Sequence, residues 1–222
     1  MNPRALSLLL IFITFVTGCA PRLIAPSESE KLSLLLLEYP VINEATCSSF
    51  LAKLLAATTS SGSKPMRILL IDSVSPMALT PQPHVVVVSK GLLIAFENEG
   101  EAFFTIAHEV AHTELQHHKH PSLFGWLEPM PSRKEMELAA DDLALTRLAR
   151  TGYPAEDALA ALTKAYNLSP SNDPAHSSEY PLLSERIAAL LPRIAELAQE
   201  KFPRAVSHRE YQECRANMAR RR

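Results

Sequence analysis

Residues 108–112 read HEVAH, and this pentapeptide constrains the fold more than any other part of the chain. Side chains four positions apart on an α-helix differ by about 40° in direction, so His108 and His112 project from one side and can bind the same cation. Apolar residues between Phe103 and Val110 recur at the spacing of a buried helix face. The pattern therefore predicts a buried helix that presents both histidines on one side, where they could bind a metal ion.

Glu109 lies on the flank of the same predicted helix, which places a carboxylate near the metal without making it a ligand. Neutral imidazole suits zinc, and a catalytic zinc keeps one position for water and lowers the pKa of that water to ~7. A neighbouring carboxylate can then take the proton of the water and pass it to the leaving amine. The pattern therefore predicts Glu109 as a general base, and an ordinary helix with two chance histidines is the alternative.

A zinc ion held by two histidines alone would be bound weakly, so a third ligand is expected from another segment. Glu137 and Asp141, in EMELAADD, lie four positions apart on the next predicted helix and share a face. Two acids buried together repel each other unless a cation or a hydrogen-bond donor lies between them. We therefore predict that Glu137 completes a Zn²⁺ site and that Asp141 accepts the free ring N–H of a histidine ligand. A solvent-facing acidic stripe is the alternative.

His118 is a second candidate for the third ligand because it matches the last position of the pattern HExxHxxGxxH. That pattern needs glycine three residues after the second histidine, where the chain turns back toward the metal, and this sequence has Leu115. A helix former at this position predicts that the helix continues and turns His118 away. We therefore expect His117, His118 and His120 to form the polar end of the helix.

The chain as a whole predicts an α+β fold that is mostly helical with a small β-sheet. Two short aliphatic runs, residues 66–72 and 84–89, predict strands, and the turn-rich segment 76–83 separates them. Residues 31–57 fit one or two helices with an interruption near Pro40. Three further helices are expected. The first covers about 132–150, with Ser132 as its N-cap and Glu135 three residues on. The second covers about 155–166, and the third begins at Ser184 and is kinked or divided at Pro192.

Residues 1–18 have the features of a secretory signal, since the apolar run from Leu6 to Val16 is too short to span a bilayer. The run ends in Val-Thr-Gly-Cys, which resembles the lipobox of bacterial lipoproteins and makes Cys19 the lipid-bearing first mature residue. A plain secretory signal with a chance cysteine is the alternative. Position 20 lacks the aspartate that often retains lipoproteins at the inner membrane, so we expect an outer-membrane protein that faces the periplasm.

One domain is expected after the signal, because about two hundred residues suffice for a single sizeable core. We place a Pro-, Ser- and Glu-rich tether at 19–30, the folded domain at 31–205 and a basic tail at 206–222. The tail is expected to be a frayed, solvated terminus or a contact for anionic lipid headgroups. The chain has 22 Lys plus Arg against 24 Asp plus Glu, which argues against nucleic acid as a partner.

Two cysteines remain after Cys19 is assigned to lipid. Cys47 and Cys214 are an even pair in a compartment that permits disulfides. They predict a bridge that joins the two ends of the domain, and two separate buried thiols are the alternative.

Taken together, the motifs resemble one family of zinc metallopeptidases. HEVAH, the ELAAD segment with Glu137 and Asp141, and SERIAAL from Ser184 are similar to motifs of the HtpX-like and CAAX-prenyl-protease-like metallopeptidases, gluzincins that pair HExxH with ExxxD. SKGLL, His117 and TGYPAEDAL extend the similarity to about residues 66–191. The resemblance implies a zincin-like fold, one Zn²⁺ per chain and a zinc endopeptidase.

The sequence departs from the family pattern in two places. Residues 77–78 read Met-Ala where family members commonly carry Asn-Ala, and Tyr180 stands where they commonly carry the histidine of a His-Pro pair. The Tyr180 hydroxyl could donate a hydrogen bond to a developing oxyanion, or the ring could be a packed surface aromatic. Arg186 looks like the family arginine that pairs with Asp141, another carboxylate or the substrate carbonyl, and a surface salt bridge is the alternative.

Two functions are compatible with these features. In the first, a lipid-anchored zinc endopeptidase cleaves unfolded or misassembled envelope proteins, with Glu109 as general base. In the second, a chaperone-like or scaffold lipoprotein binds zinc without catalysis, which the two departures favour. Both have the lipid membrane as a partner through Cys19.

Overall fold

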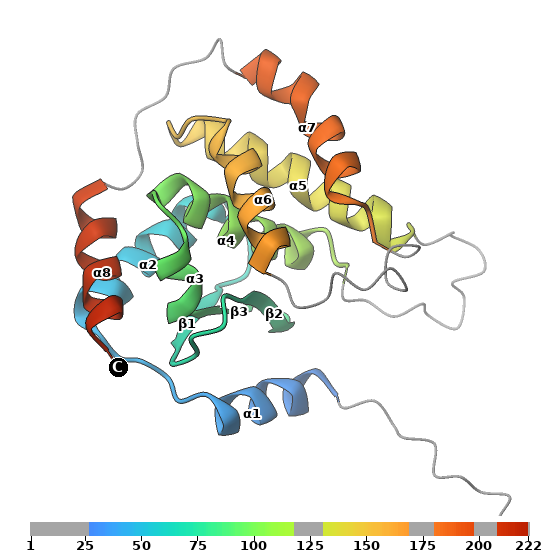
Figure 1. Ribbon diagram of the computed structural model, residues 1–222. Helices are drawn as coiled ribbons and strands as arrows, with labels where there is room; N and C mark the ends of the chain where they lie inside the picture. The colour runs from blue at the N-terminus through green and yellow to red at the C-terminus, as the bar shows by residue number, and fades with distance from the viewer. Residues whose placement is uncertain (1–26, 118–130, 169–179, 198–207, 222) are drawn as a thin grey trace, which may run out of the picture.

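The computed structural model describes residues 27–117, 131–168, 180–197 and 208–221. Over these residues the chain has a mostly helical α+β fold with a small sheet, as the sequence predicts (Figure 1). The elements, in chain order, are α1 Glu28–Glu38, α2 Ala45–Thr58, β1 Arg67–Ile71, β2 Ala78–Gln82, β3 Val85–Ser89, α3 Lys90–Ala95, α4 Glu99–Glu114, α5 Arg133–Arg150, α6 Asp157–Leu168, α7 Leu183–Leu197 and α8 His208–Arg220.

The sheet is mixed and has the strand order β1-β3-β2. β1 pairs with β3 in parallel, with Arg67 opposite Val85, and β2 pairs with β3 antiparallel. The central strand β3 is buried along its whole length, because helices cover both faces of the sheet. On one face Val86 and Val88 join the main core with the helices, and on the other Val87 packs against α1 (Figure 1).

The prediction of a turn-rich connection over residues 76–83 is wrong, because β2 occupies this segment. Pro81 has no N–H to donate to a sheet, but β2 is an edge strand and needs to pair on one side only. The register of β2 against β3 also shifts between Leu79 and Gln82, around the proline. The sheet therefore has three strands where the sequence predicts two.

The helix boundaries follow their caps. A capping box of Ser27 and Glu30 starts α1 at Glu28, inside the tether predicted for residues 19–30. The predicted capping box of Ser132 starts α5, and Gly152, with φ 80°, follows its end. α7 remains one helix through Pro192, so the predicted alternative of a division there does not occur.

The C-terminal residues form helix α8, and the expectation of a frayed terminus is wrong. Tyr211, Cys214 and Met218 are fully buried against the rest of the domain. The predicted disulfide is present and joins Cys47 of α2 to Cys214 of α8. The packed part of the chain therefore extends beyond residue 205, to the end of α8.

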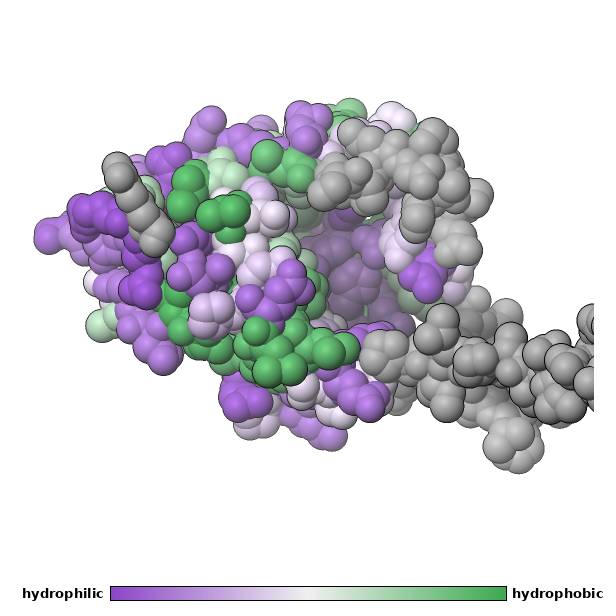
Figure 2. All heavy atoms as spheres, turned by 60° about the horizontal axis from the view of Figure 1, so that its bottom comes forward, coloured by the Kyte–Doolittle hydropathy of each residue, from purple (hydrophilic) through white to green (hydrophobic). Residues whose placement is uncertain are grey.

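Within the described residues, none of the helices has the length and apolar character needed to cross a membrane. The outer side of α1 nevertheless exposes apolar side chains, with Leu34 57% and Leu37 84% exposed. Figure 2 turns the bottom of the molecule, where α1 lies in Figure 1, toward the viewer. On this side it shows a group of hydrophobic residues with polar residues around it.

Gly91, in the SKGLL segment at the start of α3, lies directly against the chain that follows β1. Its N–H donates to the carbonyl of Ser73 (2.9 Å), and a Cβ at this position would lie 2.1 Å from the carbonyl oxygen of Val74. We expect Gly91→Ala to lower the free energy of unfolding by about 1–3 kcal/mol, because backbone and not a flexible side chain must move. Urea denaturation measures the effect, and an unchanged midpoint would contradict it.

Asp157, at the start of α6, packs against the first turn of α4. Its Oδ1 accepts a hydrogen bond from Nδ2 of Asn98 (3.1 Å), and its Oδ2 lies 2.0 Å from the position that a Cβ at Gly100 would take. Burial raises the pKa of Asp157 to about 6, and the neighbouring carboxylates of Glu101 and Glu99 add to the increase.

This carboxyl group should make stability depend on pH. Its pKa is about 6 in the folded protein against a usual 3.8, so the folded state binds the proton more tightly and is stabilised by it. That stabilisation is present below about pH 4 and is lost as the pH rises through about 6. We expect Asp157→Asn to raise the free energy of unfolding at neutral pH by about 1 kcal/mol, a value reduced by solvent screening of this half-buried group. Urea denaturation at about pH 4 and at neutral pH measures the gain in the free energy of unfolding. An equal gain at both pH values would contradict the raised pKa of Asp157.

Candidate metal centre

Helix α4 carries the HEVAH motif through the core of the domain. The side chain of Asn98 caps its start by accepting the N–H of Glu101 (2.9 Å). The helix contacts α2, α5, α6 and β2, and most of its residues are buried. The predicted apolar face therefore holds the motif inside the domain, where His108 is only 9% exposed.

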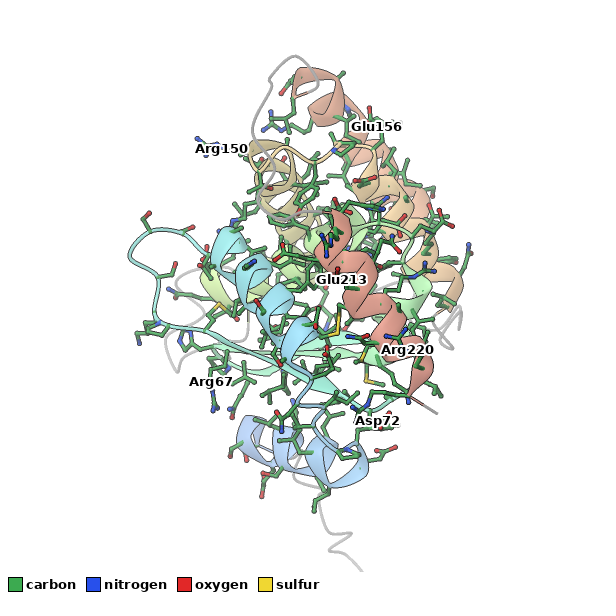
Figure 3. All side chains as sticks on the ribbon, turned by 90° about the vertical axis from the view of Figure 1, so that its left-hand side faces the viewer. Arg67, Asp72, Arg150, Glu156, Glu213 and Arg220 are labelled. Atoms are coloured by element: carbon green, nitrogen blue, oxygen red, sulfur yellow. A yellow bond between two sulfur atoms is a disulfide. The ribbon has the colours of Figure 1, made fainter. Side chains whose placement is uncertain are left out.

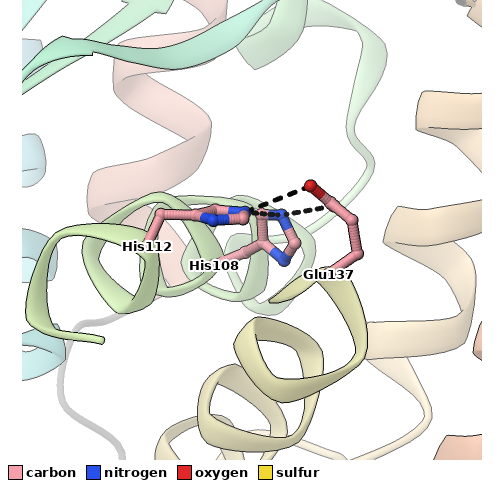
Figure 4. Close-up of side chains that lie close together, drawn as sticks. All are labelled: His108, His112 and Glu137. Carbon is pink, nitrogen blue, oxygen red and sulfur yellow. Dashed lines mark hydrogen bonds and ion pairs between the residues drawn. The ribbon is translucent and has the colours of Figure 1, made fainter. Parts of the chain in front are cut away.

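His108, His112 and Glu137 bring their side chains together between α4 and α5 (Figure 4). One possible ligand atom from each lies within 4.8 Å of the other two. The Nε2 atoms of the two histidines are 3.0 Å apart, and the carboxylate oxygens of Glu137 lie 3.3 Å from Nε2 of His108 and 3.5 Å from Nε2 of His112. The three predicted ligands therefore converge, and the cluster they form could hold a metal ion.

Asp141 supports the cluster from one turn further along α5. Its side chain is 1% exposed, and its Oδ1 lies 2.9 Å from Nδ1 of His108, as the sequence predicts. Arg186 of α7 donates to the same carboxylate through Nε and Nη2, both at 2.6 Å, and its Nη2 lies 3.8 Å from Glu137. Of the partners that the sequence suggests for Arg186, Asp141 is the one that it binds, and this contact joins α7 to the cluster of His108, His112 and Glu137.

The charges of the cluster favour a cation. Burial disfavours the charged imidazole of His108, but hydrogen bonds with Asp141 and Glu137 outweigh it and raise its pKa to about 10. Burial and the charge on His108 lower the pKa of His112 to about 4. Burial opposes ionisation of Glu137, yet its contact with His108 holds the pKa below the usual value. The charged ring of His108 thus lies between the carboxylates of Asp141 and Glu137, and a metal ion can take the place of the proton on its Nε2.

The end of α4 differs from the prediction. The helix does not continue past Leu115, because Gln116 adopts a left-handed conformation with φ 60°. The N–H of His117 then donates to the carbonyl of His112 (3.0 Å), and the N–H of Gln116 to that of Thr113 (3.1 Å), which is a Schellman motif. This turn brings Nδ1 of His117 to 2.9 Å from Nδ1 of His112. His118 and His120 lie outside the described residues.

Glu109 contacts a residue that the sequence does not identify. Thr80, on edge strand β2, places its hydroxyl 3.0 Å from Oε2 of Glu109 and 3.1 Å from its backbone carbonyl, and can donate to either. Burial raises the pKa of Glu109, and the positive charge of His108 opposes the increase. A raised pKa suits a group that must take up a proton. Thr80 has no local sequence signal, since the contact joins a strand to a helix 29 residues later.

Tyr180 lies at the surface, where its contact is with α5. Its hydroxyl accepts a hydrogen bond from Arg133, whose guanidinium lies 5.3 Å above the ring, and the residue is 36% exposed. In the described part of the chain, no hydrogen bond joins Tyr180 to the metal-binding side chains. The structure therefore brings Glu109 and Arg186 to the cluster but leaves Tyr180 outside it. Cys19, the predicted lipidation site, lies outside the described residues.

Comparison with protein-family models and with curated proteins finds no match to this chain. The family resemblance therefore depends on the motifs and on the geometry of the His108, His112 and Glu137 cluster.

Proposed function

We propose that the protein is a zinc-dependent endopeptidase with a zincin-like fold, similar to the HtpX-like and CAAX-prenyl-protease-like metallopeptidases. The observation that carries the proposal is the convergence of His108, His112 and Glu137, from two helices, with the partly buried Glu109 next to His108 in α4. A partly buried acid with a raised pKa next to two histidines is more than a metal-binding site needs, and it matches what hydrolysis requires.

The donor set fits zinc. Two imidazole nitrogens and one carboxylate form one of the three-ligand combinations found in catalytic zinc sites. Asp141 holds the ring of His108 by its Nδ1, which leaves Nε2 to face the cluster. A zinc ion bound here would polarise the scissile carbonyl and lower the pKa of its bound water toward neutrality.

The residues of the chain have distinct roles in the proposed reaction. Glu109 takes the proton of the attacking water and passes it to the leaving amine. Thr80 holds the carboxylate of Glu109 at 3.0 Å, so that one oxygen is fixed and the other is left for the proton. Arg186 neutralises Asp141, so that Asp141 can orient His108 without adding an uncompensated buried charge.

The proposed location is the bacterial envelope, with a lipid on Cys19 holding the domain at the outer membrane on its periplasmic side. The apolar run and lipobox-like residues before position 20 support this. The Cys47–Cys214 disulfide supports it too, because disulfides persist in oxidising compartments. The proposed substrates are unfolded or misassembled envelope proteins.

One observation favours the second candidate, a zinc-binding chaperone-like or scaffold lipoprotein without catalysis. Tyr180, which could serve as a donor to the oxyanion, lies instead at the surface against Arg133 and makes no hydrogen bond with the described residues of the cluster. Zinc analysis combined with cleavage of unfolded casein tests both candidates. The endopeptidase is expected to bind one zinc ion, to lose cleavage with a chelator and to regain it with added zinc. One bound zinc with no turnover of casein would favour the second candidate.

A further inference from the structure

A groove of about 520 Å³ lies between α2 and β1, away from the metal centre. Leu51 and Leu55 of α2 form one wall, and Met66 with residues 67–70 of β1 forms the other. β1 is the edge strand opposite to β2, whose Thr80 contacts Glu109, and no residue of the metal cluster lines the groove. The groove is therefore a separate surface with a mostly apolar floor.

The free edge of β1 forms the backbone side of this groove. The N–H of Arg67 donates to the carbonyl of His84 before β3 (2.9 Å), so alternate residues of β1 direct their peptide groups toward β3. The peptide groups of Ile68 and Leu70 point the other way, into the groove. The carbonyl of Leu70 accepts the N–H of Ile42 (2.7 Å). Among the described residues, no hydrogen bond is made by the N–H or C=O of Ile68 or by the N–H of Leu70.

A short segment of the chain already pairs with one end of this edge. Val41 forms an antiparallel bridge with Ile71, and the chain then leaves the edge at Asn43 to begin α2. The unpaired peptide groups of β1 begin at the point where residues 41–42 leave the edge of the strand. An extended chain could continue its direction along β1 toward Arg67 and supply the missing partners.

The two ends of the groove differ in charge. Lys64 and Arg67 are exposed at the end where β1 begins, and none of the described residues that line the groove is acidic. Figure 3 shows Arg67 pointing away from the ribbon at this end. A chain antiparallel to β1 would bring its C-terminal end there, so acidic side chains at that end would meet both cations.

We propose that the groove binds an extended polypeptide segment as an added strand, antiparallel to β1, with acidic side chains near its C-terminal end at Lys64 and Arg67. Backbone hydrogen bonds with Ile68 and Leu70 provide part of the affinity, and alternate apolar side chains pack on Ala52 and Ala56, exposed apolar residues of the α2 wall. This binding surface is independent of the proposed peptidase activity, because the groove and the metal centre share no residue.

The test uses the full chain and a fluorescent peptide, Val-Thr-Val-Thr-Val-Asp-Glu with both ends blocked, and measures binding by fluorescence anisotropy. Arg67→Glu is expected to weaken binding about 10-fold at low salt and less at high salt. The matched control is Arg150→Glu, an exposed arginine at the far end of α5 (Figure 3), which should bind as the wild type does. A peptide with lysines in place of its two acids should bind about 10-fold more weakly.

A second probe keeps the test independent of protein variants. N-methylation of alternate peptide groups removes donors to the edge of β1 and is expected to weaken binding about 10-fold. Glu109→Gln should bind the probe as the wild type does, so loss of catalysis and loss of this site are distinguishable. Equal affinity for the methylated and unmethylated peptides would overturn the proposal. A second result would also overturn it: the wild type forms a dimer that binds no peptide, and Arg67→Glu dissociates this dimer. A second copy of the chain would then occupy the groove.

Discussion

Replacing Glu109 with glutamine is expected to leave zinc bound and to reduce the cleavage of casein by about 10²–10⁴-fold. Glutamine keeps the shape of the side chain and can still accept the hydrogen bond of Thr80. It cannot take up the proton of a water molecule, so only the proton transfer is lost. Zinc analysis of the purified variant and release of fluorescent fragments from labelled casein measure the two outcomes separately.

Glu156→Gln is the matched control for this change. Glu156 is exposed before α6, so the same loss of one carboxylate there should change neither zinc content nor cleavage. Cleavage retained by Glu109→Gln would refute Glu109 as the general base. Loss of zinc from that variant would show instead that Glu109 belongs to the ligand set.

A ligand variant would be harder to interpret than Glu109→Gln. Removal of the Glu137 carboxylate would also remove the negative charge beside His108 and Arg186. The charged groups left behind would be buried with fewer partners, at a cost in stability. Loss of activity could then follow from altered folding as well as from loss of the metal.

The sequence predicts the cluster of His108, His112 and Glu137 better than the fold around it. The i, i+4 spacing in HEVAH and the ExxxD pair each place two side chains on one helix face, and this local geometry needs no knowledge of tertiary contacts. From this local geometry the sequence predicts that His108, His112 and Glu137 converge and that Asp141 contacts His108, and the structure has both features. The two cysteines are predictable as a pair because few alternatives exist.

The wrong predictions have local causes. β2 is missed because Pro81 and its neighbours favour turns, while its place at the sheet edge is a tertiary property. The end of α4 is missed because Gln116, without the usual glycine, adopts the left-handed conformation. α8 is missed because its charged residues dominate the composition, although Tyr211 and Met218 form a buried face.

Contacts between distant segments cannot be predicted from one sequence in this way. Thr80 meets Glu109, and Arg133 meets Tyr180, only because strands and helices pack together as they do. The free edge of β1 also depends on the point at which the chain after Val41 leaves the sheet. Each of these features follows from the packing of elements and has no recurring spacing along the chain.

Removal of the Cys47–Cys214 disulfide is expected to have the largest effect on stability. The bridge joins cysteines 167 positions apart, and both are fully buried. Closing a loop of this length contributes about 5 kcal/mol in the chain-entropy model, and measured gains are often smaller. We therefore expect Cys47→Ala combined with Cys214→Ala to lower the free energy of unfolding by about 3–5 kcal/mol, as measured by urea denaturation without reductant.

Thiol reduction provides the matched control for this variant. Dithiothreitol should destabilise the wild type by a similar amount and leave the double variant unchanged. Because both sulfur atoms are buried, reduction requires α8 to separate from α2, so its rate should follow the local opening of α8. Equal urea midpoints for the oxidised wild type and the double variant would mean that the packing of Tyr211 and Met218 alone holds α8 on the domain.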